Sequence, residues 1–174
     1  MKIEFSSDGE MQITRKDGDK IGRINEAYFK TENDSEQAKI TEKRRDWFMR
    51  EFPEAANVIK VDDKIIGSTL VLPCTLRLMN LFISKNINEE QLFQELERTA
   101  SYSNIETIYF CSAIIVPEFR RKGLATQAVE KSIKKMLSKT KNKVKTIFYW
   151  GYSNEGSALA GKIAKDLGLE LKKR

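Results

Sequence analysis

Histidine is absent from this 174-residue sequence, and cysteine occurs only as Cys74 and Cys111. The absence of histidine excludes serine–histidine triads, cysteine–histidine pairs and histidine-rich zinc sites. Each cysteine lies inside an apolar stretch, which is typical of a small buried residue rather than a nucleophile or a metal ligand. No metal site is predicted, and a general base must be a carboxylate, a tyrosine, a thiolate, a lysine or an ordered water.

The sequence also lacks long apolar runs, internal repeats, low-complexity tracts and linkers. No run approaches the length of a membrane span, and the opening "MKIEFSSDGE" has no basic-then-apolar signal architecture. We therefore expect a cytoplasmic protein that does not bind membranes. A chain of 174 residues is long enough to bury the core of one domain, which we assign to residues 1–174.

Acidic residues are scarce in one segment, although the whole chain has a net charge of only +6. Residues 118–145 hold ten lysines and arginines against Glu118 and Glu130, so this segment carries +8 and the remainder −2. A segment of this kind favours an anionic partner. Nucleic acid is an unlikely one, because the segment lacks interleaved aromatic residues and much of it lies on one helix face, where a solvated surface is the favoured interpretation.

The first half of the chain predicts strands around one helix. Residues 1–30 contain three short strand-like segments separated by "SSDG" and "KDGD", and Asp-Gly is a hairpin signal, so we expect a strand meander there. Residues 35–50 predict a helix that Ser35 caps and that ends before Pro53. Residues 57–73 predict a hairpin, since two β-branched runs flank an Asp-Asp turn.

The second half predicts a pattern of helices and buried strands. Two short helices fill residues 75–99, and the second has the capping-box pattern at its start. Residues 105–116 and 143–153 are too β-branched and aromatic for helices and predict central strands. Residues 154–168 predict a helix and residues 169–174 a terminal edge strand or a tail, and the whole pattern gives an α/β domain with helices on both faces of a sheet.

The stretch "VPEFRRKGLATQAV" combines a strand end, a cationic turn and a helix start. Pro117 ends the preceding strand, Gly123 permits a tight turn, and an amphipathic helix begins at Leu124. The triplet at 120–122 places three cations at a helix N-terminus, where the helix dipole disfavours positive charge. Because backbone N–H groups at such a terminus bind anions, we expect a phosphate group there.

This stretch resembles the coenzyme A-binding signature of the GCN5-related N-acetyltransferase (GNAT) superfamily. The signature Gln/Arg-x-x-Gly-x-Gly/Ala is filled by Arg120, Gly123 and Ala125. The family's Asn-x-x-Ala/Ser after the fifth core strand is matched by Asn154 and Ser157. The order of elements from residue 35 to 171 also fits, so the resemblance covers most of the chain and implies a mixed, mostly antiparallel sheet.

The resemblance implies acetyl-CoA as co-substrate, with its pyrophosphate on the N–H groups of residues 121–126 and its pantetheine arm paired with Ala113 and Ile115. Asn154 either contacts this arm, as in the family, or only caps a helix. The residues expected to bind the cofactor are Ala113, Ile115, Arg120, Arg121, Lys122, Gly123, Leu124, Ala125, Thr126 and Asn154.

Two features depart from the family pattern. A tyrosine that often protonates the departing thiolate is replaced by Gly161, and Tyr149 and Tyr152 are either its substitutes or packing residues. The family joins its third and fourth strands directly, whereas residues 75–99 form a helical insertion here that is expected to reshape the acceptor side.

Acyl transfer to an amine requires a hydrogen-bond donor for the thioester oxygen and a route for the proton of the amine. The backbone amide of Ile115 is the expected donor. The position of the family's glutamate base falls on Tyr109, and Glu106 lies near it, although a solvated carboxylate at a strand start is favoured for Glu106. Cys111 has no histidine partner and is interpreted as a core residue, so direct transfer in a ternary complex is expected.

The sequence thus predicts an N-acetyltransferase that uses acetyl-CoA and a primary amine on a small molecule or a protein. A non-catalytic acyl-CoA-binding regulatory module and, less favoured, a nucleic-acid-binding domain stay open as alternatives. A homodimer is also possible.

Overall fold

Six strands form one sheet in the order of the chain. They are β1 (Ile3–Phe5), β2 (Ala56–Val61), β3 (Lys64–Cys74), β4 (Thr107–Ile115), β5 (Thr146–Tyr149) and β6 (Glu170–Lys173). In this computed structural model, which describes residues 2–9, 11–140 and 143–174, the pairs β1–β2, β2–β3 and β3–β4 are antiparallel. The pairs β4–β5 and β5–β6 are parallel. The mixed, mostly antiparallel sheet that the resemblance implied is confirmed.

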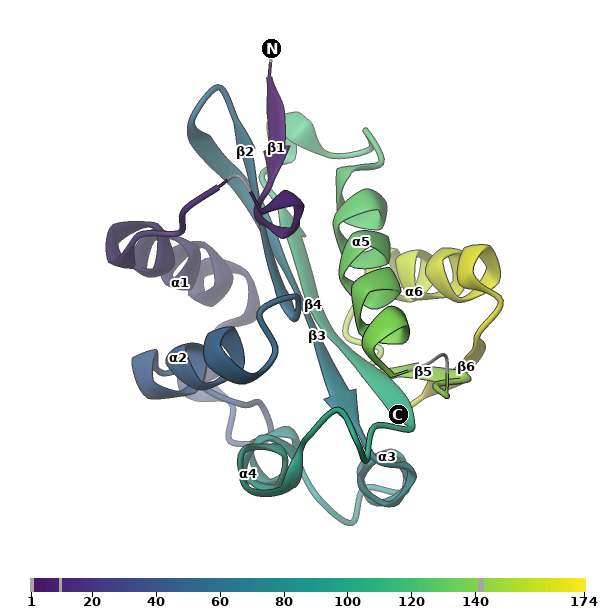
Figure 1. Cartoon of the computed structure of the whole chain (residues 1–174). Helices are drawn as coiled ribbons and strands as arrows, with labels where there is room; N and C mark the ends of the chain where they lie inside the picture. Colours follow the sequence, from purple (N-terminus) through teal and green to yellow (C-terminus); the bar gives the residue numbers. More distant parts are fainter. Residues whose placement is uncertain (1, 10, 141–142) are drawn as a thin grey trace.

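Helices cover both faces of this sheet (Figure 1). Helices α1 (Arg15–Phe29) and α2 (Glu42–Glu51) lie on one face, and α5 (Leu124–Lys139) and α6 (Asn154–Leu167) lie on the other. Between β3 and β4 the chain forms α3 (Leu76–Ile83) and α4 (Glu89–Thr99). None of the helices in the described residues is long and apolar enough to cross a membrane.

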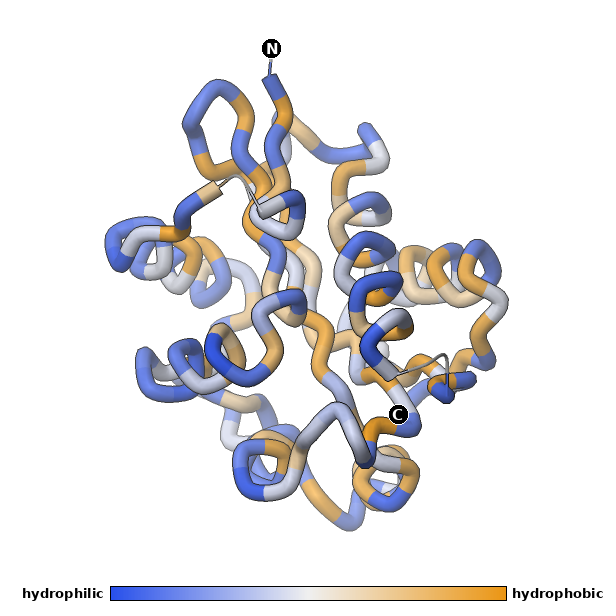
Figure 2. The backbone as a smooth tube through the Cα atoms, viewed as in Figure 1, coloured by the Kyte–Doolittle hydropathy of each residue, from blue (hydrophilic) through white to orange (hydrophobic). Residues whose placement is uncertain are grey.

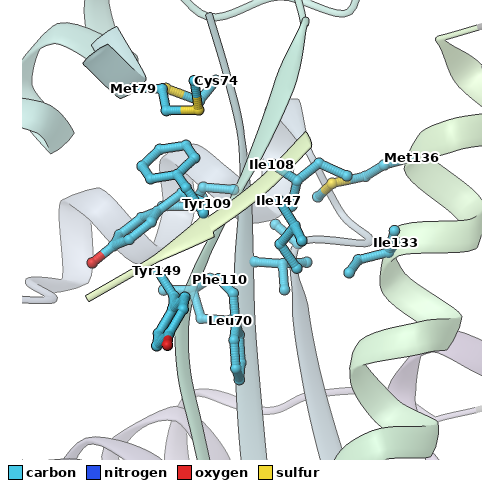
Figure 3. Close-up of a cluster of buried hydrophobic side chains, with 14 of the residues drawn as sticks. Leu70, Cys74, Met79, Ile108, Tyr109, Phe110, Ile133, Met136, Ile147 and Tyr149 are labelled. Carbon is cyan, nitrogen blue, oxygen red and sulfur yellow. The ribbon is translucent and has the colours of Figure 1, made fainter. Parts of the chain in front are cut away.

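The sheet separates two layers of buried side chains. In Figure 3, Ile108 and Ile147 of the strands point toward Ile133 and Met136 of α5, whereas Tyr109 points to the opposite side. These side chains belong to one large buried cluster. Hydrophobic residues follow the central strands, and hydrophilic residues predominate on α1 and α2 (Figure 2), as expected for helices that use one side to cover a core.

The strand meander predicted for residues 1–30 is wrong beyond β1. The chain forms α1 there because Thr14 and Asp17 make a capping box, in which the Asp17 N–H donates to Thr14 Oγ1 and the Thr14 N–H donates to Asp17 Oδ2, each at 3.1 Å. The Asp-Gly pair that indicated a hairpin instead lies in the first turn of this helix.

The helix predicted for residues 35–50 begins later than expected. Thr41, not Ser35, caps α2, and its Oγ1 accepts a hydrogen bond from the Arg44 N–H at 3.2 Å. The predicted end before Pro53 is correct, since Phe52 is the C-cap residue.

The local signals at the two short helices and at the hairpin are confirmed. Asn88 and Gln91 form the capping box of α4, and Thr75 caps α3. The β2–β3 hairpin turns at Asp62 and Asp63, which both adopt positive φ angles, of 46° and 65°.

Candidate active site

Strands β4 and β5 separate halfway along the sheet. Their pairing runs from Thr107–Thr146 to Phe110–Tyr149, where β5 ends, whereas β4 continues to Ile115. At the point of separation β4 carries a bulge, because Phe110 and Ser112 pair with consecutive residues of β3 and Cys111 is the extra residue. One edge of β4 is therefore open in the interior of the sheet.

The backbone of β4 presents polar groups to this opening. The Val116 N–H donates to Ile66 O at 2.8 Å, so the Gly67–Ile115 pair beside it is of the non-hydrogen-bonded type. The alternation of an antiparallel pair then directs the N–H groups of Ile115 and Ala113 away from β3. They point into the opening, where they are placed to donate to a ligand that lies alongside β4 like a further strand.

The turn after β4 leaves the N-terminus of α5 free for a ligand. Arg121 and Gly123 adopt left-handed conformations, with φ angles of 59° and 74°. Gly123 is the N-cap residue and makes no side-chain hydrogen bond to the first turn, whose N–H groups are left to bind an anion. A left-handed conformation costs a non-glycine residue about 1–2 kcal/mol, and such strain is concentrated at functional sites.

The three cations of this turn do not act as a set. Arg120 folds back, and its Nε donates to Ile115 O at 2.9 Å while its guanidinium contacts the hydroxyl and ring of Tyr28. The Lys122 ammonium lies 5.0 Å from the centre of the Phe119 ring. Arg121 is exposed and has no hydrogen bond or ion pair with any residue that the structure describes, so it is the cation available to an anionic ligand.

A cleft of about 600 Å³ runs from the open edge of β4 to this turn and the first turn of α6. Lys122 and Asn154 are not among its lining residues. The cap of α6 is Ser153, whose Oγ accepts from the Gly156 N–H at 2.9 Å, so the interpretation of Asn154 as the cap is wrong. The other expected cofactor-binding residues all line the cleft: Ala113, Ile115, Arg120, Arg121, Gly123, Leu124, Ala125 and Thr126.

A second cavity, of about 190 Å³, lies between the sheet and helices α1 and α2. The two cavities meet at the bulge of β4. They share the residues Phe29, Cys111, Ser112, Trp150 and Tyr152. A ligand held along β4 therefore has its end beside a ligand held under α1 and α2.

Sequence reasoning missed a buried carboxylate at this meeting point. Glu89, the first residue of α4, is 7% exposed and lines the second cavity. Its Oε1 accepts from the Tyr109 hydroxyl at 2.5 Å and lies 3.6 Å from Cys111 Sγ, and its Oε2 accepts from the Ala38 N–H at 2.8 Å. Burial raises the pKa of Glu89 above its ordinary value of 4.5, against the opposing effect of these hydrogen bonds.

The expected catalytic side chains lie in different surroundings. Tyr109 is fully buried, its pKa is raised mainly by burial, and its hydroxyl is committed to Glu89. Glu106 is exposed and outside both cavities, and its Oε2 accepts from the Leu76 N–H at 3.0 Å at the start of α3. The pKa of Cys111 is raised by burial and by Glu89, which keeps it a thiol.

The tyrosines near the end of β5 differ in their access to the site. Tyr149 is buried and lines the larger cleft but not the second cavity. Tyr152 is 51% exposed and lines both cavities. Its hydroxyl accepts from Gln37 Nε2 at 2.8 Å, which leaves the phenolic proton free to be donated.

Three lysines of the basic segment are paired with acidic residues of the chain. Lys131 pairs with Asp8 at 2.6 Å, and Lys139 pairs with the buried Glu54 at 2.7 Å. Lys134 pairs with Glu130 along α5.

Comparison with known proteins identifies the family. The model of the acetyltransferase (GNAT) family matches residues 21–158, which is most of the chain. The chain therefore belongs to the acetyltransferase (GNAT) family. It is an acetyl-CoA-dependent N-acetyltransferase.

Two solved structures resemble this chain at low sequence identity, and the first of them has the same fold. Arabidopsis thaliana Naa50, in complex with a bisubstrate analogue, is 13% identical with a TM-score of 0.54, over 97% of this chain and 83% of that one. An aminoglycoside acetyltransferase from an uncultured soil metagenomic sample is 13% identical with a TM-score of 0.45, over 95% of this chain and 85% of that one. No curated protein sequence matches this chain.

Proposed function

We propose that the protein transfers the acetyl group directly from acetyl-CoA to a primary amine while both substrates are bound. The observation that carries this proposal is the meeting of the two cavities at Cys111 and Ser112. A cofactor in the larger cleft and an acceptor in the smaller cavity would bring thioester and amine together there, and such positioning supplies a large part of the rate enhancement in bimolecular transfer. The raised pKa of Cys111 argues against an acetyl-cysteine intermediate.

We assign the cofactor to the open edge of β4 and the turn that follows. The pantetheine arm would pair with Ala113 and Ile115, and the pyrophosphate would bind the N–H groups of residues 123–126 with the guanidinium of Arg121. The N–H of Ile115 would then donate to the thioester oxygen as charge develops on it. We omit Lys122 and Asn154, because neither lines the cleft.

Protonation of the departing thiolate is assigned to Tyr152. Its hydroxyl has a free proton, lies at the junction of the cavities and takes the place of the tyrosine that is missing at Gly161. The acceptor would be the primary amine of a small molecule or a protein, bound under α1 and α2.

Calorimetric titration with acetyl-CoA tests this assignment. Arg121→Glu should weaken binding more than tenfold, because a charge-assisted hydrogen bond worth about 1.5–3 kcal/mol is replaced by repulsion. Lys122→Glu is the matched control, since it makes the same change of charge one residue away, and it should weaken binding less than threefold. Equal losses would contradict the assigned role of Arg121.

Turnover is measured separately, as thiol release from acetyl-CoA in the presence of primary amines. Release that depends on the amine supports transfer. Tight binding of acetyl-CoA without release for any amine would contradict the proposed transfer to a primary amine.

A further inference from the structure

We propose that Glu89 binds the ammonium group of the acceptor and takes its proton, and that the acceptor carries this amine on an apolar chain. This inference rests on the proposed acetyl transfer. It assigns a catalytic role to a residue of the helical segment between β3 and β4, where sequence reasoning found none.

The position of the carboxylate supports this role. Glu89 lines the acceptor cavity, and its Oε1 lies 3.6 Å from the sulfur of Cys111, a residue that lines both cavities. The Tyr109 hydroxyl and the Ala38 N–H each hold one carboxylate oxygen. A base with both oxygens fixed beside the junction is oriented for a proton that leaves there.

The surroundings also make this carboxylate a stronger base than a solvated one. The charged and titratable groups that face Glu89 are Tyr109 and Cys111 of β4 and the guanidinium of Arg174, which follows β6. The positive charge of Arg174 lowers the pKa of Glu89, but burial outweighs it and the pKa is raised. A carboxylate with a raised pKa accepts a proton from an ammonium more readily than a solvated one does.

The other charged groups of the acceptor cavity are already engaged. The carboxylate of Glu26 accepts from the Thr31 hydroxyl at 2.5 Å and from two backbone N–H groups. Arg45 pairs with Asp19 at 3.7 Å. Glu89 is thus the buried carboxylate that lines this cavity.

The rest of the wall limits what the amine can be attached to. Apolar side chains from α1, α2, β2, β3 and the segment after β5 line the cavity: Ile21, Phe29, Phe48, Val58, Leu70 and Trp150. A second ammonium group held against these apolar side chains would lose its hydration at a large cost in free energy, and the other carboxylate of the cavity, Glu26, already accepts three hydrogen bonds. A monoamine on an apolar chain therefore fits this wall better than a polyamine does.

The reaction balances with these groups. The ammonium transfers one proton to the Glu89 carboxylate, and the free amine attacks the thioester carbonyl carbon. The carbon–sulfur bond then breaks, and the thiolate takes the phenolic proton of Tyr152. The nitrogen still carries two hydrogens, and one of them passes as a proton to the Tyr152 oxygen. The products are the acetamide and CoA thiol, and Glu89 releases its proton to solvent.

The test uses the intact protein with acetyl-CoA and two probe amines, n-heptylamine and spermidine. Thiol release is measured from pH 5.5 to 9 for the wild type, Glu89→Gln and the control Glu26→Gln, which removes a carboxylate of the same cavity. Thermal unfolding and acetyl-CoA titration of each variant separate a folding defect from a catalytic one.

We expect kcat/KM for heptylamine to exceed that for spermidine at least tenfold. Glu89→Gln should lower kcat by about 10²-fold, the usual contribution of a general base, and should abolish the fall of kcat/KM at acid pH. Glu26→Gln should keep this fall of kcat/KM at acid pH, the acid limb of the profile. A purely structural role of Glu89 would leave the acid limb in place in Glu89→Gln, and that result would overturn the proposal.

The outcomes separate this inference from the proposed function. Turnover with spermidine equal to that with heptylamine, or acetyl-CoA binding with no turnover of heptylamine, overturns the inference alone. Failure to bind acetyl-CoA overturns both.

Discussion

Replacement of Gly67 by alanine should damage both the fold and the cofactor cleft. Gly67 of β3 faces Ile115 of β4, and a Cβ at this position would lie 2.4 Å from Ile114 O and 2.6 Å from Ile115 Cδ1. The first of these contacts is with the backbone of β4, which β3 holds through the Ser68–Ile114 pair, so no side-chain rotation relieves it. Overpacking of this kind costs about 1–3 kcal/mol, and we expect the upper end of that range.

For a chain of this size, a loss of about 3 kcal/mol corresponds to a fall of about 6–12 °C in Tm. Relief of the clash would also displace Ile115, whose N–H is assigned to the thioester oxygen, so acetyl-CoA should bind more weakly. Thermal unfolding and calorimetric titration measure the two effects.

Gly161→Ala is the matched control for this experiment. Gly161 lies inside α6, and a Cβ at this position would have no neighbouring atom within 4 Å. Alanine is favoured over glycine in a helix by about 1 kcal/mol, so this variant should raise Tm by about 2–4 °C. A Gly67→Ala protein that unfolds within about 1 °C of the wild type, a shift too small for the expected clash, would refute the packing argument.

Three further predictions concern ionisable side chains. The Arg44 guanidinium holds the pKa of Glu90 at about 2, so ionised Glu90 stabilises the fold above pH 4.5 and this contribution is lost as the pH falls toward 2. In Glu90→Gln, the free energy of unfolding measured in urea should therefore fall less steeply at acid pH. Glu89 has the opposite effect on stability, because its raised pKa makes ionisation costly in the folded state. Stability should therefore decline as the pH rises above 4.5 toward the folded pKa, and Glu89→Gln should remove this decline in the same urea experiment. Tyr152→Phe keeps the ring contacts with Phe29 and Trp150 but should lower kcat by about 10²-fold in steady-state kinetics, and an unchanged kcat would exclude Tyr152 as the acid.

The features that the sequence predicted best depend on neighbours in the chain. The turn at 120–123 and the capping box of Asn88 and Gln91 each lie within a few residues, so local chemistry specifies them. The central strands were predictable because burial on both faces leaves a continuous β-branched and aromatic run.

The two main errors have different causes. The Asp17–Gly18 pair suits a turn as well as a helix start, and the helix is selected by a local signal, the capping bond from Thr14, together with a distant one, packing under Arg45. Glu89 looks like an ordinary acidic residue in the first turn of a helix. Its burial comes from Ala38 and Tyr109, which are 51 and 20 residues away, and no local signal indicates it.

The separation of β4 and β5 has a consequence for the solubility of the protein. An open strand edge is a template on which other polypeptides can pair and aggregate. Here the open edge lies inside the sheet, bordered by the end of β5, the turn before α5 and the first turn of α6. Only the short stretch of β4 from Cys111 to Ile115 lies beyond the end of β5, so another polypeptide would find a much shorter length of open strand here than at the rim of a sheet.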